Sequence, residues 1–155
     1  MSPLAQEAVI PNPALEPFRV LVGEWTTEGT HPHVPGKVFH GRASFQWIEG
    51  GAFLMMRSET DEPEVPSGLA IFGSDNVAGE CWMLYFDERG VSRNIQTAMR
   101  DGVWTWWRYN PKFSQRFTGT FTDGGRTLVS KGEMSKDGGP WEPDLQLTYK
   151  RVEEE

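Results

Sequence analysis

The sequence predicts an all-β protein, specifically a ten-stranded antiparallel up-and-down barrel, preceded by a short N-terminal helix. Seven tryptophans, nine phenylalanines, three tyrosines and seventeen glycines are typical of strands and tight turns rather than helices. Turn signals also recur at roughly the interval expected for successive strands. The expected strands cover residues 24–31, 37–48, 52–60, 67–74, 80–87, 91–100, 103–109, 114–122, 126–135 and 144–152.

The connections between these strands are of two kinds, which alternate along the chain. The first kind is mostly short and rich in glycine, as in residues 49–51, 74–79, 101–102 and 123–125. The second kind is mostly longer and rich in proline and charge, as in residues 31–36, 61–66, 87–90, 110–113 and 136–143. Alternate connections of a meander lie at opposite ends, so a closed barrel with one sealed end and one open mouth explains the pattern. A β-sandwich is the alternative.

The chain of 155 residues is expected to form one domain. We expect residues 1–12 to be a flexible leader and residues 13–152 to form the barrel. Apolar residues in Pro13–Val22 follow a helical spacing, with Asn12 as the N-cap and Pro13 at the first helical position. Gly23 ends this helix.

Charge and composition narrow the classes of partner. The formal net charge of −7 argues against nucleic acid or an anionic membrane, since both need a basic face. Cys81 is the single cysteine and suits a small buried side chain better than a reactive thiol. The first residues lack the features of a secretory signal, and we expect a cytoplasmic protein, either monomer or homodimer, whose partner is a small-molecule ligand.

Alternation along the first two strands separates an inner from an outer face. In residues 37–48, Phe45 and Trp47 share the apolar face, whereas His40 lies on the polar face. In residues 24–31, the same reasoning turns Trp25 and His31 inward.

Two arginines are predicted to face the interior near the mouth. Asp101-Gly102 is a strong two-residue hairpin signal, and its register pairs Arg100 with Val103. Alternation along residues 91–100 turns Arg93 inward, and this register then turns Trp104, Trp106 and Arg108 inward. A half-buried guanidinium is costly unless an anion or strong acceptor meets it, which makes this wall the expected ligand site. The alternative is that each arginine pairs with Asp87 or stacks on a tryptophan for architectural reasons.

Asp87 has two interpretations. In Asp87-Glu88-Arg89-Gly90 it can accept hydrogen bonds from turn amides, or it can stand at the mouth near Arg93 as an acid or base. The turn is the favoured interpretation. Tyr85, on the same strand, is expected at the rim of the cavity.

The two ends of the predicted barrel carry a family resemblance. Gly23-Glu24-Trp25 follows the helix, and Tyr149-Lys150-Arg151 ends the last strand. A G-x-W motif near the start with a basic residue on the final strand resembles the calycin superfamily, to which lipocalins and fatty-acid-binding proteins belong. GEWTTEGTHP with LTYKRV is similar to the nitrobindin-type ten-stranded barrels, and YFDERGVSR, FSQRF and WEPDLQLTYKR resemble an uncharacterised bacterial branch of that group.

The resemblance implies a barrel around a small-molecule cavity. In nitrobindins a histidine near the start of the last strand ligates haem iron, and Asp144 stands at the matching position here. Alternation would instead turn Leu145 and Leu147 inward. Because aspartate is not a usual haem ligand, haem is disfavoured as a cofactor, although His31 could serve from the opposite side of the mouth.

No motif in the sequence identifies a reaction. His31-Pro32-His33 is an H-x-H pair without a third ligand in sequence, so we expect no metal site there. The leading hypothesis is a barrel that binds a small, largely apolar molecule with an anionic or carbonyl group. Its expected binding residues are Arg93, Arg108, Trp104, Trp106, His31, Tyr85, Phe45 and Trp47. The alternatives are a cofactor-free enzyme with Asp87 or His31 as general base, haem or nitric-oxide chemistry, and an interaction module whose interior is filled by its own side chains.

Overall fold

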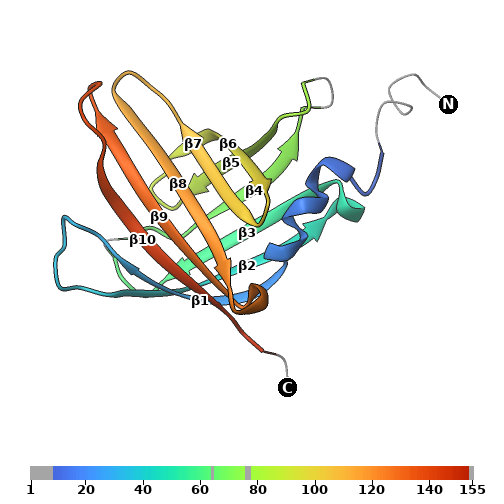
Figure 1. Cartoon of the computed structure of the whole chain (residues 1–155), viewed down its shortest axis with the longest axis horizontal. Helices are drawn as coiled ribbons and strands as arrows, with labels where there is room; N and C mark the ends of the chain where they lie inside the picture. Colours follow the sequence, from blue (N-terminus) through green and yellow to red (C-terminus); the bar gives the residue numbers. More distant parts are fainter. Residues whose placement is uncertain (1–8, 64, 76–77, 154–155) are drawn as a thin grey trace.

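The computed structural model describes residues 9–63, 65–75 and 78–153 and shows ten antiparallel strands closed into one barrel (Figure 1). Each strand pairs with its neighbours in sequence, and the first strand pairs with the last. The strands are β1 (Gly23–Thr30), β2 (Phe39–Ile48), β3 (Phe53–Thr60), β4 (Gly68–Ser74), β5 (Cys81–Asp87), β6 (Ser92–Arg100), β7 (Val103–Arg108), β8 (Phe113–Thr122), β9 (Thr127–Lys136) and β10 (Glu142–Arg151). The predicted fold class is confirmed, and every expected strand is present with ends shifted by at most two residues.

The expected N-terminal helix is present as a 3₁₀ helix, η1 (Pro13–Leu21). The Asn12 side chain caps it by accepting a hydrogen bond from the Ala14 amide at 3.0 Å. Pro17 lies inside the helix and removes an amide donor that a regular α-helix would use. Of the leader expected over residues 1–12, residues 1–8 lie outside the part of the chain that the structure describes.

This helix seals the end of the barrel where the tight hairpins gather (Figure 1). Its capping residue, Asn12, donates a backbone hydrogen bond to Gly51 O at 2.9 Å and a side-chain hydrogen bond to Ser74 Oγ at 2.8 Å. The Phe18 ring meets the Phe72 ring of β4 edge to face, with centroids 5.4 Å apart. The helix therefore acts as a plug, and the longer loops surround the opposite, open end.

The plug is fastened to the first and last strands. Trp25 Nε1 donates to Leu21 O at 2.8 Å, and Arg151 Nη1 donates to Val22 O at 2.6 Å. The Arg151 guanidinium also lies 4.1 Å from the centroid of the Trp25 ring. Gly23 starts β1 with a φ of 132°, and a Cβ there would lie 2.7 Å from Arg151 Nη1, so only glycine fits. The G-x-W motif and Arg151, the basic residue at the end of the last strand, thus contact each other directly.

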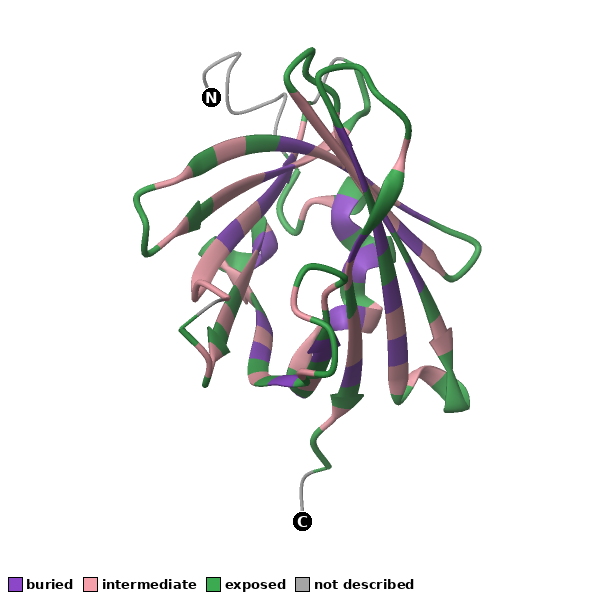
Figure 2. Ribbon diagram, turned by 90° about the vertical axis from the view of Figure 1, so that its left-hand side faces the viewer, coloured by how far each residue is buried: buried purple, intermediate pink, exposed green. Residues whose placement is uncertain are grey.

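Buried residues alternate with more exposed ones along most strands, as the colours of the ribbon in Figure 2 show. Aromatic rings fill the half of the interior next to the plug. Phe45 and Phe72 lie within 6.1 Å of the Trp104 ring, and Trp104 Nε1 donates to Thr97 Oγ1 at 2.9 Å. These rings form the floor of the remaining interior space.

The β6–β7 hairpin has the predicted register. Asp101 and Gly102 have φ angles of 53° and 73°, the positive values that a type I′ turn needs. Arg100 pairs with Val103, and the same register continues along both strands. Among the described residues, no helix is both long and apolar enough to cross a membrane.

Candidate functional site

A cavity of about 380 Å³ lies between the aromatic floor and the mouth. Its walls are mainly apolar and include Met56, Met83, Ile95, Trp106, Phe117 and Leu147. Trp106 and Phe117 are cross-strand partners on β7 and β8, and their rings stack with centroids 3.9 Å apart. A cavity of this size and character is typical of small-molecule sites.

The structure places five of the eight expected binding residues on the cavity wall. They are His31, Tyr85, Arg93, Trp104 and Trp106. They come from β5, β6 and β7 and from the end of β1, so the register inferred from the hairpin brings the tryptophans and Arg93 together as expected.

The other three expected residues lie elsewhere. Phe45 faces inward but belongs to the floor, and Trp47 lies nearer the plug, with the Arg19 guanidinium 5.5 Å from its ring centroid. Alternation gives the side of the sheet and not the depth along the strand, which explains both differences. Arg108 is half-buried at the end of β7, opposite Gln115, but is not part of the cavity wall. Within the described residues Arg108 makes no hydrogen bond or ion pair.

A chain of polar contacts runs across the mouth from β6 to β10. Arg93 Nη1 donates to Gln115 Oε1 at 3.3 Å, and Gln115 Nε2 donates to Asp144 Oδ2 at 2.8 Å. His31 Nε2 lies 3.0 Å from Asp144 Oδ1, which also accepts from the Leu145 amide at 2.7 Å. Gln115 therefore has one orientation, with its oxygen toward the guanidinium and its nitrogen toward the carboxylate.

The hydrogen bonds of His31 define its tautomer. The His33 amide donates to His31 Nδ1 at 3.0 Å, so the neutral imidazole carries its proton on Nε2 and donates it to Asp144. Both ring nitrogens are engaged within the protein.

A β-bulge turns Asp144 into the barrel. Pro143 pairs with Glu133 and Gln146 pairs with Lys131, so Asp144 and Leu145 together stand opposite one residue of β9. Both residues consequently line the cavity, whereas strict alternation allows only one of them to do so. This bulge reconciles the two sequence-based placements of Asp144 and Leu145.

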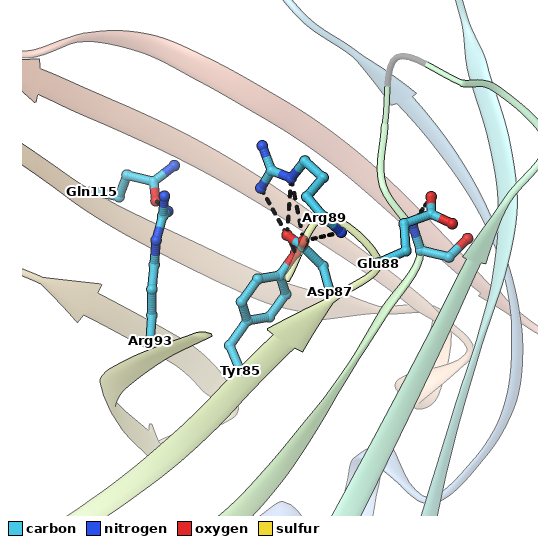
Figure 3. A network of polar contacts seen from close by, with 7 residues as sticks. Tyr85, Asp87, Glu88, Arg89, Arg93 and Gln115 are labelled. Atoms are coloured by element: carbon cyan, nitrogen blue, oxygen red, sulfur yellow. Dashed lines mark hydrogen bonds and ion pairs between the residues drawn. The ribbon is translucent and has the colours of Figure 1, made fainter. Parts of the chain in front are cut away.

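Tyr85, Asp87 and Arg89 form a second polar cluster at the mouth (Figure 3). The Arg89 guanidinium and amide donate to the Asp87 carboxylate at 2.7 Å and 2.9 Å, and Tyr85 Oη donates to it at 2.8 Å. The hydrogen bond from Arg89 is the main cause of an Asp87 pKa well below its usual value. Burial is the main cause of a Tyr85 pKa raised to about 12, and the Asp87 carboxylate adds to it. Asp87 thus organises the β5–β6 turn, as the favoured interpretation has it.

We expect Asp87→Asn to destabilise the protein near neutral pH, because the ionised carboxylate loses its charge-assisted hydrogen bonds. A carboxylate with a lowered folded pKa contributes stability above its unfolded pKa and loses that contribution as pH falls through the folded value. The stability difference between wild type and variant should therefore stay constant at neutral pH and shrink below about pH 4. Denaturant unfolding at several pH values measures it, with Glu24→Gln, an exposed position, as the control. A difference that does not depend on pH would contradict the expectation.

Sequence reasoning did not single out two polar residues of the cavity, Gln115 and Asp144, as binding residues. Alternation along β8 could have identified Gln115, because it shares a face with the inward-facing Phe117, whereas Arg116 lies on the other face. Arg116 lies on the outer face, where its Nε donates to Glu133 Oε1 at 3.0 Å.

The residues described here hold no group of three or more His, Cys, Asp or Glu side chains that could bind a metal ion. The rings of His31 and His33 lie with centroids 4.9 Å apart, and His31 is bonded to Asp144 as described above.

No family model matches the chain, and no curated protein matches it by sequence. The fold is similar to that in the crystal structure of Rv2717c from M. tuberculosis, with a TM-score of 0.62 and 15% identity over 91% of this chain and 98% of that one. It is also similar to a protein of unknown function from the DUF3598 family of Nostoc punctiforme PCC 73102, with a TM-score of 0.60 and 15% identity over 87% of this chain and 48% of that one. At these identities, the chain shares with both proteins a fold and nothing more specific.

Proposed function

We propose that this protein binds a small, largely apolar molecule carrying an anionic or carbonyl group inside the barrel. The proposal rests on one observation: within the described residues, the Arg93 guanidinium has no anionic partner. The guanidinium reaches the cavity with a single hydrogen bond of 3.3 Å, to the neutral amide of Gln115. Within the described residues no carboxylate pairs with it, and the guanidinium carbon lies 5.9 Å from the centroid of the Phe113 ring.

A half-buried guanidinium with several free donors needs an acceptor. The other arginines on the cavity wall have carboxylate partners, since Arg42 pairs with Glu59 and Arg89 with Asp87. A ligand carboxylate or carbonyl at Arg93 would supply what the protein itself does not. The apolar wall behind it favours a hydrocarbon or aromatic body.

The alternative of a cofactor-free enzyme is less well supported. A general base needs a free lone pair directed at the substrate. Both nitrogens of His31 are engaged, and the Asp87 carboxylate is saturated by Arg89, Tyr85 and the turn. The idea of an interaction module with a filled interior is opposed by the cavity of about 380 Å³.

Haem chemistry of the nitrobindin kind does not fit the residues present. The position that matches the nitrobindin ligand holds Asp144, whose two oxygens accept from His31, Gln115 and the Leu145 amide. His31 has no free nitrogen for an iron atom. The calycin or nitrobindin-like relationship, and location in the cytoplasm, stay predictions from the sequence.

Replacing Arg93 by leucine tests the proposal. We expect the affinity for decanoate, measured by calorimetry, to fall about 10- to 100-fold, the value of a charge-assisted hydrogen bond. The affinity for decanol, which carries no charge, should change little. The matched control is Arg116→Leu, because Arg116 lies on the outer face and binds Glu133. A folded Arg93→Leu variant that binds decanoate as wild type does would exclude Arg93 as the anchor.

A further inference from the structure

Three hydroxyl groups on the cavity wall have no hydrogen-bond partner within the described residues. They belong to Thr27 of β1, Ser130 of β9 and Tyr149 of β10. Ser130 and Tyr149 are only 4% and 8% exposed. Over the described chain, Trp47 Nε1 is the one side-chain polar atom that is both sealed from solvent and unpartnered. The hydroxyls of Ser130 and Tyr149 are therefore open to a molecule in the cavity.

The hydroxyls on the other side of the cavity are all satisfied. Ser58 Oγ donates to Gly68 O at 3.4 Å, Thr60 Oγ1 to Glu62 O at 3.2 Å, and Tyr85 Oη to Asp87 at 2.8 Å. The protein thus provides partners for the hydroxyls of β3 and β5 and leaves those of β1, β9 and β10 without any. A buried hydroxyl without a partner is unfavourable, so these three need a ligand or water to bond to.

The three hydroxyls gather on adjoining strands at the inner end of the cavity. Thr27 stands directly opposite Tyr149, and Ser130 stands opposite Leu147, two residues before Tyr149 on the same face of β10. Trp25, whose ring lies 6.3 Å from that of Tyr149, belongs to the floor side. Neighbours of this kind in a sheet are within reach of one side chain or one ligand group.

This end of the cavity is electrically neutral. Arg151, the cation on the same face of β10 as Tyr149, is hydrogen-bonded to the carbonyls of Val20 and Val22, and Lys150 lies on the exposed face. Burial raises the pKa of Tyr149 to about 12, so the phenol stays protonated and can donate. A neutral group that both accepts and donates, or only accepts, suits such a site better than a carboxylate does.

We propose that Thr27, Ser130 and Tyr149 form a second polar subsite, which binds a hydroxyl or carbonyl group at the far end of the ligand. The inference rests on the proposed function and specifies its ligand as an amphiphile with polar groups at both ends. The charged end lies at Arg93 near the mouth, and the neutral end lies at the floor.

The spacing of the two subsites follows from β10. Gln115 connects Arg93 to Asp144, and Tyr149 is five positions further along the strand. At the rise of a β-strand five positions span about 16 Å, and the bulge at Asp144 and Leu145 shortens this distance between backbone positions by up to one residue. Because side chains project from both points, the ligand is a medium-length chain or a fused-ring body of similar length.

Paired probes that differ by one terminal hydroxyl test the subsite. Octanoate, decanoate and dodecanoate are titrated calorimetrically against their ω-hydroxy counterparts, so that one length can match the spacing. Wild type should bind the best-matched ω-hydroxy acid about tenfold more tightly than its parent acid, as one added hydrogen bond provides. Tyr149→Phe should lose this preference while keeping the affinity for the parent acid.

Two further variants and a matched control complete the test. Thr27→Val and Ser130→Ala should each reduce the preference, which keeps the proposal testable if one variant does not fold. Tyr109→Phe should leave it unchanged, because Tyr109 is 65% exposed. Two results would overturn the subsite. In the first, the parent acids bind through Arg93 but no ω-hydroxy acid binds more tightly than its parent. In the second, all three variants keep the wild-type preference for the ω-hydroxy acid.

Decanol separates the failure of the two proposals. Suppose that Tyr149→Phe weakens the binding of decanol, whereas Arg93→Leu leaves the affinity for decanoate unchanged. This result supports the subsite and overturns the proposed anchor at Arg93. If wild type binds none of these probes, both proposals are wrong.

Discussion

Replacing Phe72 by alanine is expected to lower the free energy of unfolding by about 3–5 kcal/mol, the usual cost of deleting a fully buried phenylalanine. Phe72 is completely buried on β4, where its ring contacts those of Phe18, Phe45 and Trp104. The substitution opens a space between the plug and the floor that rigid rings cannot refill. Urea unfolding followed by tryptophan fluorescence measures the change.

The matched control for this prediction is Phe86→Ala. Phe86 belongs to the neighbouring strand β5 but is 41% exposed, so its loss should cost much less. Equal losses in the two variants would show that the rings near the plug do not hold the structure together. We expect the Phe72 variant also to loosen η1, which hydrogen exchange of the amides of residues 13–21 would reveal.

Replacing Arg151 by methionine is expected to cost about 2–4 kcal/mol of stability, from charge-assisted hydrogen bonds and a cation–π contact. The guanidinium donates to the carbonyls of Val20 and Val22 and lies over the Trp25 ring. Methionine keeps the apolar stem but leaves both carbonyls without their partner. Thermal or denaturant unfolding measures the loss.

Lys150→Met serves as the control for this prediction, because Lys150 is exposed on the same strand and its removal changes the net charge equally. We expect little effect there. If both variants lose the same stability, the effect comes from the charge of the C-terminal strand, and the specific contact with Val20, Val22 and Trp25 is unimportant.

The strand order and the β6–β7 register could be predicted because both depend on local signals. The Asp101-Gly102 turn sets which residues of β6 and β7 face inward, and this placed Arg93, Trp104 and Trp106 correctly inside the barrel. Depth along the barrel was harder, since it depends on where the plug ends. Phe45 and Trp47 share the inner face with cavity residues, but they pack toward η1.

The polar part of the site depends on contacts that no local pattern shows. Asp144 enters the cavity through a bulge, and a bulge is visible only when the pairing of β9 with β10 is known. The free hydroxyls of Ser130 and Tyr149 could be placed inside by alternation. That they lack partners follows only from the positions of every neighbouring group.

The contact between η1, Trp25 and Arg151 also bears on the order in which the barrel folds. Residues more than 120 positions apart meet in it, and the pairing of β1 with β10 closes the barrel across 116 to 126 positions. Closing so long a loop carries a large entropic cost, and folds dominated by such contacts form slowly. The nine hairpin pairings can form between sequence neighbours, whereas this seam must wait for both ends of the chain. The contact between the Arg151 guanidinium and the Trp25 ring should therefore form only when the barrel closes.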